Sequence, residues 1–418
     1  MRPRKLYSGP ILTLGTVQFV ESIAVSIPLS YFPFYAQSLG ASVALIGLFS
    51  SSFMIAQAVL APRIGGLSDR LGRKRLIVWG LIGDIALGVM TALAPNWIWL
   101  LVIRVLNGAV TAVATVPADA LLVDLTTEKT RGEAMGFVLA MNMMGRTIGP
   151  GFGGFIQWIA QSSGLSLLDS FRIPYFADSF LAFVALLLVF LLIKEPKRPK
   201  KIKKPLGNQI ANSQARDTKI SLSITILLLA SLVAGLGMGF LIPVSVLFYN
   251  DAFGVSPIEI GLILSIIGLI GFFASWFSGR VSDRVGRKPI VVYGGLVARF
   301  FGIAIPFASN INQAALLMAF RRLGYSVYRP ALHALRADLM PPHARGKILG
   351  WFKTVFNIGS MIGPVMGTWL YSLYRFETLN IGGLVLPGYG FPFFINAAFG
   401  IVSSLLILVF VKPRPING

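Results

Sequence analysis

Long apolar stretches alternate with short polar segments along the whole chain. Each stretch is about 20 residues or longer, the length that a helix needs to cross the hydrocarbon core of a bilayer. The pattern therefore predicts an all-α integral membrane protein with twelve transmembrane helices. We expect them at 10–37, 42–67, 76–94, 97–125, 132–161, 173–194, 220–250, 257–281, 289–309, 311–338, 346–373 and 388–412.

One polar segment occurs twice in the chain. Residues Gly65–Arg75 read GGLSDRLGRKR, and residues Gly279–Pro289 read GRVSDRVGRKP. Asp124, Gly145, Gly149, Pro150 and Gly153 recur at the same offset, close to half of the 418 residues, as Asp338, Gly359, Gly363, Pro364 and Gly367. A repeat of six helices gives two halves that cross the membrane in parallel. We expect six-helix bundles at 1–194 and 220–418, joined by a basic linker at 195–219.

The first copy follows the pattern Gly-x-Leu-x-Asp-Arg-x-Gly-Arg-Lys. This resembles the signature between the second and third helices of the major facilitator superfamily. The resemblance implies two bundles around a central cavity and transport by alternating access. We predict a conformational latch of charged groups at adjacent helix ends. A solvated basic turn that only fixes topology is the alternative. The latch residues would be Gly65, Asp69, Arg70, Gly72, Arg73, Asp124, Gly279, Asp283, Arg284, Gly286, Arg287 and Asp338.

Composition agrees with a membrane protein and excludes several kinds of site. The chain is 55% hydrophobic and 13% charged, and its mean hydropathy is +0.75. It has no cysteine, which excludes disulfides and thiolate metal sites. Its two histidines, His333 and His343, do not have a metal-binding spacing. We therefore expect no metal and no cofactor.

The net charge of +21 is explained by topology. Most of the 37 Lys and Arg residues lie in the segments that twelve crossings place on the side of both termini, and only Arg172 and Arg375 lie in loops on the opposite side. Cytoplasmic segments carry such an excess. We therefore predict a monomeric, multi-pass protein of the cell membrane, with both termini and the linker in the cytoplasm and no nucleic-acid partner.

The helix predicted at 132–161 contains a glycine-rich segment. Gly145, Gly149, Pro150, Gly153 and Gly154 match the antiporter signature of the family, Gly-x-x-x-Gly-Pro-x-x-Gly-Gly, which is found in drug/proton exporters. Such a stripe of small residues lets another helix pack closely, and proline adds a bend. The resemblance implies export, while ordinary helix packing is the alternative.

Charged residues lie within apolar helices of the first half. Arg104, followed by Gly108, resembles the family's Arg-x-x-x-Gly signature near the proton site, and Asp119 lies on the same helical face. Glu21 lies well inside the first predicted helix, where family members often have an acidic residue. A charge at the centre of a membrane helix costs at least about 2.5 kcal/mol, so a function is expected.

We predict that Glu21, Arg104 and Asp119 couple transport to protons, with Glu21 as the carrier. A carboxyl group in a membrane can exchange between its neutral and charged forms as its surroundings change. A carboxylate that is permanently paired for structural reasons is the alternative. Asp84 and Asp178, near the ends of predicted helices, are further candidates.

The residues that we expect to line a substrate cavity include both uncharged polar side chains and cations. We predict Gln18, Asn142, Arg146, Arg322, Arg329, His333 and Lys353. The cations in the second half suit phosphate, carboxylate or an anionic lipid headgroup. They can also pair across helices or extend to the membrane surface. Aromatic and methionine side chains would supply an adaptable apolar wall.

The combined pattern predicts proton-coupled efflux of hydrophobic or amphipathic small molecules. No ATP-binding signature is present, so an ion gradient is the expected source of energy. Transport of organic anions or lipid headgroups through a cationic cavity is the alternative. A receptor or scaffold on the same fold also stays open. An intramembrane enzyme is disfavoured, because the sequence shows no nucleophile–base pair and no metal-ligand constellation.

Overall fold

A computed structural model describes residues 9–127, 130–193, 195, 222–340, 345–381 and 384–411, with only the backbone at 276–285, 345–347, 379, 381 and 384. The first half contains α1 (Gly9–Ser26), η1 (Ile27–Ser30), α2 (Phe32–Ser38), η2 (Val43–Leu45), α3 (Ile46–Leu71), α4 (Arg73–Ala92), α5 (Trp97–Asp124), α6 (Arg131–Ser162) and α7 (Leu167–Leu192). The second half contains α9 (Leu222–Phe253), α10 (Pro257–Val285), α11 (Arg287–Ala304), η3 (Ile305–Phe307), α12 (Ile311–Leu339), α13 (Arg345–Tyr374), β1 (Thr378–Ile381), β2 (Leu384–Pro387), η5 (Gly388–Gly390) and α14 (Phe391–Phe410).

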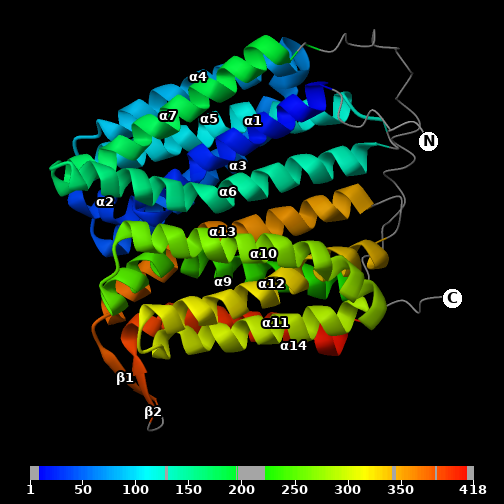
Figure 1. The fold of residues 1–418 in the computed structure, drawn as a ribbon. Coiled ribbons are helices and arrows are strands. Elements are labelled where there is room, and N and C mark those ends of the chain that lie inside the picture. Colours follow the sequence, from blue (N-terminus) through cyan, green and yellow to red (C-terminus); the bar gives the residue numbers. More distant parts are fainter. Residues whose placement is uncertain are drawn as a thin grey trace.

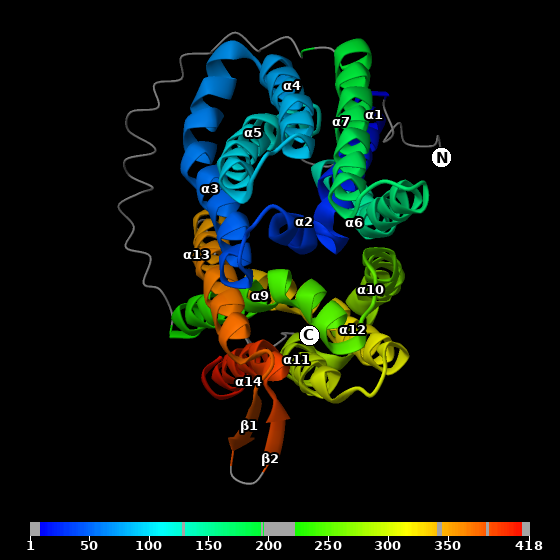
Figure 2. The same ribbon diagram turned by 90° about the vertical axis from the view of Figure 1, so that its left-hand side faces the viewer.

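The helices form two bundles, one from each half of the sequence. Helices α1 to α7 lie above α9 to α14 in Figure 1, and Figure 2 shows the same division from the side. We call the end of the molecule where α7 ends and α9 begins the linker end. The opposite end, which carries α2 and the β1–β2 hairpin, is the far end.

Hydrophobicity explains why these segments form membrane helices. Twelve long helices in the described residues correspond to the twelve predicted spans, which confirms the all-α membrane fold. Nine described helices are long and apolar enough to span a bilayer by themselves. The other three, α6, α12 and α13, contain most of the intramembrane cations. Polar residues at this depth are tolerated where they face the interior of a bundle or a cavity.

The structure corrects two local predictions. The repeated polar segment is mostly helical: α3 continues to Leu71 and α4 begins at Arg73, so Gly72 alone makes the turn, with φ of 109°. Gly286 makes the equivalent turn in the second half, with φ of 96°. The first span is also interrupted, because Pro28 and Pro33 begin new helical segments after α1.

The short hairpin at the far end was not predicted. Strands β1 and β2 pair antiparallel, with Thr378 opposite Pro387. The hairpin extends away from the helices of the second half (Figure 2). Two four-residue strands give too weak an alternation to be recognised in a sequence dominated by transmembrane segments.

The two halves are joined towards the far end. The backbone N–H of Gly47 in α3 donates to Oγ1 of Thr368 in α13 at 3.0 Å, and that of Gly151 in α6 donates to Oγ of Ser265 in α10 at 2.9 Å. Further hydrogen bonds between the halves lie in the same two regions, such as those of Ser51 with Met361 and of Thr368 with the Ala44 carbonyl of η2. The connection therefore lies away from the linker end.

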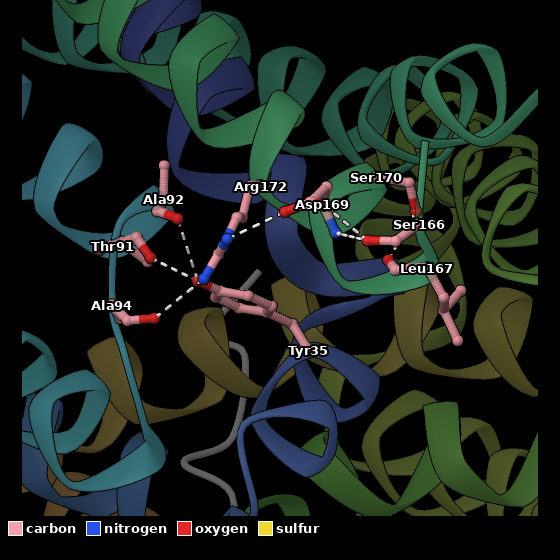
Figure 3. A network of polar contacts seen from close by, with 9 residues as sticks. All are labelled: Tyr35, Thr91, Ala92, Ala94, Ser166, Leu167, Asp169, Ser170 and Arg172. Carbon is pink, nitrogen blue, oxygen red and sulfur yellow. Dashed lines mark hydrogen bonds and ion pairs between the residues drawn. The ribbon is translucent and has the colours of Figure 1, made fainter. Parts of the chain in front are cut away.

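A polar network fixes the far end of the first half (Figure 3). The Tyr35 hydroxyl donates to the carbonyl of Thr91 at 2.6 Å, which ties α2 to the end of α4. Arg172 at the start of α7 pairs with Asp169 at 2.9 Å and donates to the carbonyl of Ala94 at 3.5 Å. Three helix ends are therefore held together where this half meets the other.

Candidate functional site

Three carboxyl side chains converge inside the first half. Glu21 of α1, Asp84 of α4 and Asp178 of α7 are half-buried and interact electrostatically with one another. Asp178 has one buried oxygen, Oδ1, that lacks a hydrogen-bond partner among the described residues. We call these three residues the carboxyl cluster.

Arg104 supplies the positive charge beside the carboxyl cluster. It interacts electrostatically with Asp84 and Asp178, and its guanidinium group lies 4.1 Å from the ring centre of Phe32. Tyr31 and Tyr175, both almost fully buried, lie edge to face beside the same groups. One guanidinium therefore interacts with two of the three carboxyls, Asp84 and Asp178, in surroundings that are largely apolar.

Asp119, the third predicted coupling residue, lies apart from this group. It is about 22 Å further along α5 than Arg104, towards the linker end. Its side chain is exposed and interacts electrostatically with Lys353 of α13 in the other half. The structure thus brings Glu21 and Arg104 into one neighbourhood and places Asp119 at a contact between opposite charges of the two halves.

Gln18 and Asn142, predicted to line the cavity, both lie next to Ser22. The Asn142 side chain donates to Oγ of Ser22 at 2.7 Å, and the Gln18 amide donates to the same oxygen at 3.4 Å. The Asn142 bond connects α6 to α1 one residue away from Glu21, and the Gln18 bond lies within α1. Arg146, further along α6, is exposed.

The glycines of α6 face two different helices. Gly145, Gly149 and Gly153 lie against Phe19, Ser26 and Ile27, so close that a methyl group would overlap these residues. Gly154 lies against α10 of the other half, where a methyl group would come within 2.8 Å of the Pro257 carbonyl. The carbonyl of Pro150 accepts a hydrogen bond from Ser30 at 3.1 Å. Helix α6 can therefore pack tightly against α1 and α10 together.

Arg73 gathers the latch residues of the first half. Its guanidinium pairs with Asp69 of α3 at 2.7 Å and with Asp124 of α5 at 3.1 Å, and it donates to Oγ of Ser68 at 2.9 Å. In the second half, Arg287 pairs with Asp338 and donates to the carbonyl of Ala334 at 3.2 Å. The described ion pairs of the predicted latch therefore lie within one half each.

The other latch residues can be placed only in part. Gly65 and Arg70 lie in the last two turns of α3, before the turn at Gly72. Gly279, Asp283 and Arg284 lie in α10, where their side chains are outside the described part of the structure. The linker predicted at 195–219 is likewise outside it, except for Glu195.

Glu195 is a latch contact that we did not predict. Its carboxylate accepts hydrogen bonds from the backbone N–H groups of Arg73 and Lys74, at 2.7 and 2.9 Å. It thereby compensates the positive N-terminal end of α4. The available signal was an acidic residue at the beginning of a strongly basic segment, which does not reveal the helix end that it reaches.

The second half encloses a cavity of about 560 Å³. Five of its lining side chains are arginines: Arg299, Arg321, Arg322, Arg329 and Arg336. Lys353 and His333 also line it, whereas no Asp or Glu does so among the described residues. We call it the arginine cavity. Its volume is that of a typical small-molecule site.

Arg299, Arg321 and Arg336 line this cavity although we did not predict them for it. The most buried of the three is Arg299. It comes from α11 and is only 4% exposed. The signal was present in the sequence, because Arg299 is the only charged residue in the central part of the span predicted at 289–309. Arg322, Arg329, His333 and Lys353, which we predicted for a substrate cavity, also line it, and their binding of substrate stays a prediction.

The model of one protein family matches almost the entire chain. Residues 14–224 and 227–418 match the model of the Major Facilitator Superfamily. The chain belongs to this superfamily. It is therefore a multi-pass membrane transporter and not an enzyme.

Related members of the Major Facilitator Superfamily include proteins named for drug resistance. The chain is 25% identical to Multidrug resistance protein 2 of Bacillus subtilis, over 91% of this chain and 93% of that protein. It is 26% identical to Multidrug resistance protein MdtG of Klebsiella pneumoniae, over 88% and 89%. These identities extend through both halves of the transporter.

Solved structures of the superfamily share the fold. A bacterial homolog of the human lysosomal transporter Spinster, in an inward-facing and unoccupied conformation, has a TM-score of 0.77 and 18% identity, covering 98% of this chain and 96% of that one. A D-xylose–proton symporter has a TM-score of 0.76 and 19% identity, covering 97% of each chain. At these identities the likeness concerns the arrangement of the helices.

Proposed function

We propose that this transporter couples proton movement to the export of amphipathic small molecules. The observation that carries the proposal is the carboxyl cluster, in which Glu21, Asp84 and Asp178 lie beside the single guanidinium of Arg104. The antiporter signature in α6 and the names of the curated relatives support export of this kind.

The proposed coupling depends on a change in protonation of the carboxyl cluster. Three carboxyls beside one cation have several protonation states that differ in net charge. An incoming cation, or a change in water access, alters which of these states is favoured. Glu21 is the proposed carrier, and Arg104 sets the charge that its carboxyl experiences. Asp119 is not part of the carboxyl cluster in this scheme, because it interacts electrostatically with Lys353 of the other half.

In the proposed alternating access, the two halves would separate at the far end and approach each other at the linker end. They are joined towards the far end by α3 with α13 and by α6 with α10, so the proposed cycle would begin with the far end closed. Closure of the linker end would bring the latch residues towards the opposite half. The ion pairs within each half would keep the helix ends in place during that movement.

We further propose that the linker end faces the cytoplasm in the cell membrane. The support is the concentration of Lys and Arg at this end, while Arg172 and Arg375 lie at the far end. Because the chain lacks cysteine, single cysteines can report each side. An impermeant thiol reagent added to intact cells should label Ser163→Cys, in the exposed turn after α6, and should spare Asn208→Cys. Labelling of Asn208→Cys from outside would reverse this topology.

Proteoliposomes with an imposed pH gradient test the function. Matched cationic, neutral and anionic amphipathic compounds would be supplied one at a time, with internal pH and compound accumulation recorded together. We expect at least one compound to accumulate with the gradient and to move protons as it does so. Transport without any substrate-dependent pH change would refute proton coupling, and absence of any transport would favour a receptor or scaffold.

A second candidate function is transport of organic anions. The arginine cavity favours it, because five arginines line a site with no acidic residue among the described side chains. The two candidates are compatible, since an amphipathic molecule can carry an anionic head. The anionic compounds in the same assay distinguish them: accumulation restricted to anions would select the second.

A further inference from the structure

The arginine cavity has a charge that its own half does not balance. Between Glu259 and Asp338, the sequence contains one acidic residue, Asp283, at the linker end of α10. Asp338 pairs with Arg287. No described salt bridge involves Arg299, Arg321, Arg322, Arg329 or Arg336. Lys353 differs from these arginines because it interacts electrostatically with Asp119 of the first half. Five guanidinium groups thus surround the cavity without a carboxylate.

Buried charges of this kind need a counter-charge. Arg322 is repelled by Arg321 and Arg329, so the cluster opposes its own assembly. Removal of an ion from water costs several kcal/mol in a protein unless partners replace the water. Four of the side chains, those of Arg299, Arg321, Arg322 and Arg336, have a buried Nε without a hydrogen-bond partner among the described residues. The described side chains therefore do not fully offset the cost of removing these arginines from water, and an anion in the cavity can supply the missing counter-charge.

Two tyrosines hold the deepest guanidinium in place. Arg299 lies 5.0 Å from the ring centres of both Tyr325 and Tyr328, and Arg321 lies 5.5 Å from that of Tyr325. The Arg299 side chain also donates to the carbonyl of Gly295 at 2.9 Å. At 4% exposure, it cannot extend to the membrane surface as a lysine or arginine near a helix end can. Its position inside the bundle is therefore fixed by the residues packed around it.

Glycines in the neighbouring helices make room for these arginines. A methyl group at Gly400 of α14 would overlap Nε of Arg299, and one at Gly271 of α10 would overlap Nε of Arg322. At Gly302 of α11 it would lie 3.4 Å from Nε of Arg321. Three helices thus have no side chain where an arginine passes, which keeps the guanidinium groups along the cavity.

We propose that the arginine cavity binds the phosphate-type head of an amphipathic monoester. A guanidinium group donates two parallel hydrogen bonds to phosphate, and several can share its oxygens. A phosphate monoester carries nearly two negative charges at neutral pH, whereas a carboxylate carries one. Met238, Leu241 and Met318 in the same wall offer an apolar surface for its tail. This deepens the anion-transport candidate but concerns binding, which does not depend on coupling or direction.

Matched probes separate this proposal from general hydrophobic binding. The full-length protein would be placed in phosphatidylcholine nanodiscs in phosphate-free buffer. Octyl phosphate, octanol and octyltrimethylammonium share one tail and differ in their heads, and isothermal titration would compare them. We expect octyl phosphate to bind at least about tenfold more tightly than the other two. Equal affinity for all three would overturn the proposal.

Substitutions then locate the site. Arg299→Gln and Arg321→Gln should each weaken octyl phosphate binding by about tenfold or more, because each removes a charged donor. Arg375→Gln removes the same charge at the far end, where Arg375 pairs with Asp251, and should bind normally. Thermal unfolding without ligand identifies any variant that does not fold; Arg329→Gln, exposed in the cavity wall, then replaces it. Unchanged affinity in the folded cavity variants would refute the site.

The source of the phosphate group can be distinguished in the same system. Nanodiscs that contain phosphatidic acid supply the group as a lipid. Loss of octyl phosphate binding in these nanodiscs, with recovery in phosphatidylcholine alone, would identify a lipid headgroup as the occupant. Unchanged binding would identify a soluble ester. Both outcomes support the phosphate site, and either can occur even if the transport assay fails, so the two proposals fail separately.

Discussion

Individual charged residues decide which chemistry each half of this transporter can perform. Glu21, Asp84 and Asp178 interact with one another, and Arg104 is the cation beside Asp84 and Asp178, so their proton occupancy can change without a large movement of the chain. The arginines of the second half have no described carboxylate partner and are suited to an anion. Proton exchange and anion binding are therefore expected on opposite sides of the central region.

Glu21→Gln should abolish accumulation driven by the pH gradient and spare substrate binding. Glutamine has nearly the same volume, but it cannot release a proton. Glu133→Gln, at the exposed start of α6, is the matched control and should transport normally. Uptake into proteoliposomes and equilibrium binding would be measured for both variants. Accumulation by Glu21→Gln at the normal level would move the carrier role to Asp84 or Asp178.

The sequence identified the charged residues within the membrane helices better than it predicted which of them lie close together. Glu21 and Arg104 stand out because a charge in an apolar helix is costly. The convergence of Asp84 and Asp178 with them depends on how α4 and α7 rotate about their axes, which hydropathy does not specify. Arg299 shows the same limit: its charge is visible in the sequence, whereas its partners Tyr325 and Tyr328 are known only from packing.

Helices and their junctions were predicted more completely. Hydropathy located all twelve long helices, because each must satisfy its backbone hydrogen bonds within the membrane. The sequence predicted a longer loop around Gly72 than the structure has, because Ser68, Asp69 and Arg70 are polar yet continue α3. Polarity identified where the chain leaves the membrane, but a helix can extend past that point.

The glycine stripe of α6 provides a test within one helix. A methyl group at Gly149 would overlap Oγ of Ser26, whereas one at Gly136 has no neighbour within 4 Å. Gly149→Ala should lower the free energy of unfolding by about 1–3 kcal/mol, as overpacking does. Gly136→Ala should leave it unchanged or raise it by up to about 1 kcal/mol. Equal thermal stability of the two purified variants would show that α1 and α6 are not tightly packed.

The latch can be tested through its exposed carboxylates. Asp69 is 66% exposed and pairs with Arg73 in this state, a contact worth about 0–1 kcal/mol. Asp69→Asn should therefore leave thermal stability nearly unchanged but lower transport several-fold, if the carboxylate stabilises the opposite state. Addition of Asp283→Asn should lower it further. Asp169→Asn, at the far end, is the control. Full transport by the double variant would exclude a latch.

At the scale of the whole molecule, the two halves share a fold but not their intramembrane charges. Arg73 and Asp124 recur as Arg287 and Asp338, and both pairs form ion pairs at the linker end. The positions equivalent to Glu21, Asp84, Arg104 and Asp178 in the packed helices are Ala234, Ala298, Met318 and Asn396, none of which is charged. The repeat thus preserves the helix junctions, while each half has its own chemistry in the membrane.

Alternating access requires the halves to move relative to each other, and a cross-link between them can prevent that movement. Oγ of Ser51 in α3 donates to the carbonyl of Met361 in α13 at 2.5 Å, across the far-end contact. A short bifunctional thiol reagent that joins Ser51→Cys to Met361→Cys should hold the far end closed and stop transport. Cleavage of the reagent should restore it.

A second pair controls for the chemistry of cross-linking. Gln157 and Ser170 are hydrogen-bonded at 2.9 Å inside the first half, between α6 and α7. Joining Gln157→Cys to Ser170→Cys should leave transport nearly unchanged, because this half moves as a unit in the proposed cycle. Octyl phosphate binding should survive in both cross-linked proteins, since the arginine cavity lies within one half and the state with a closed far end leaves it intact. Continued transport with the far end cross-linked would mean that the halves do not separate there, and alternating access would need a different moving contact.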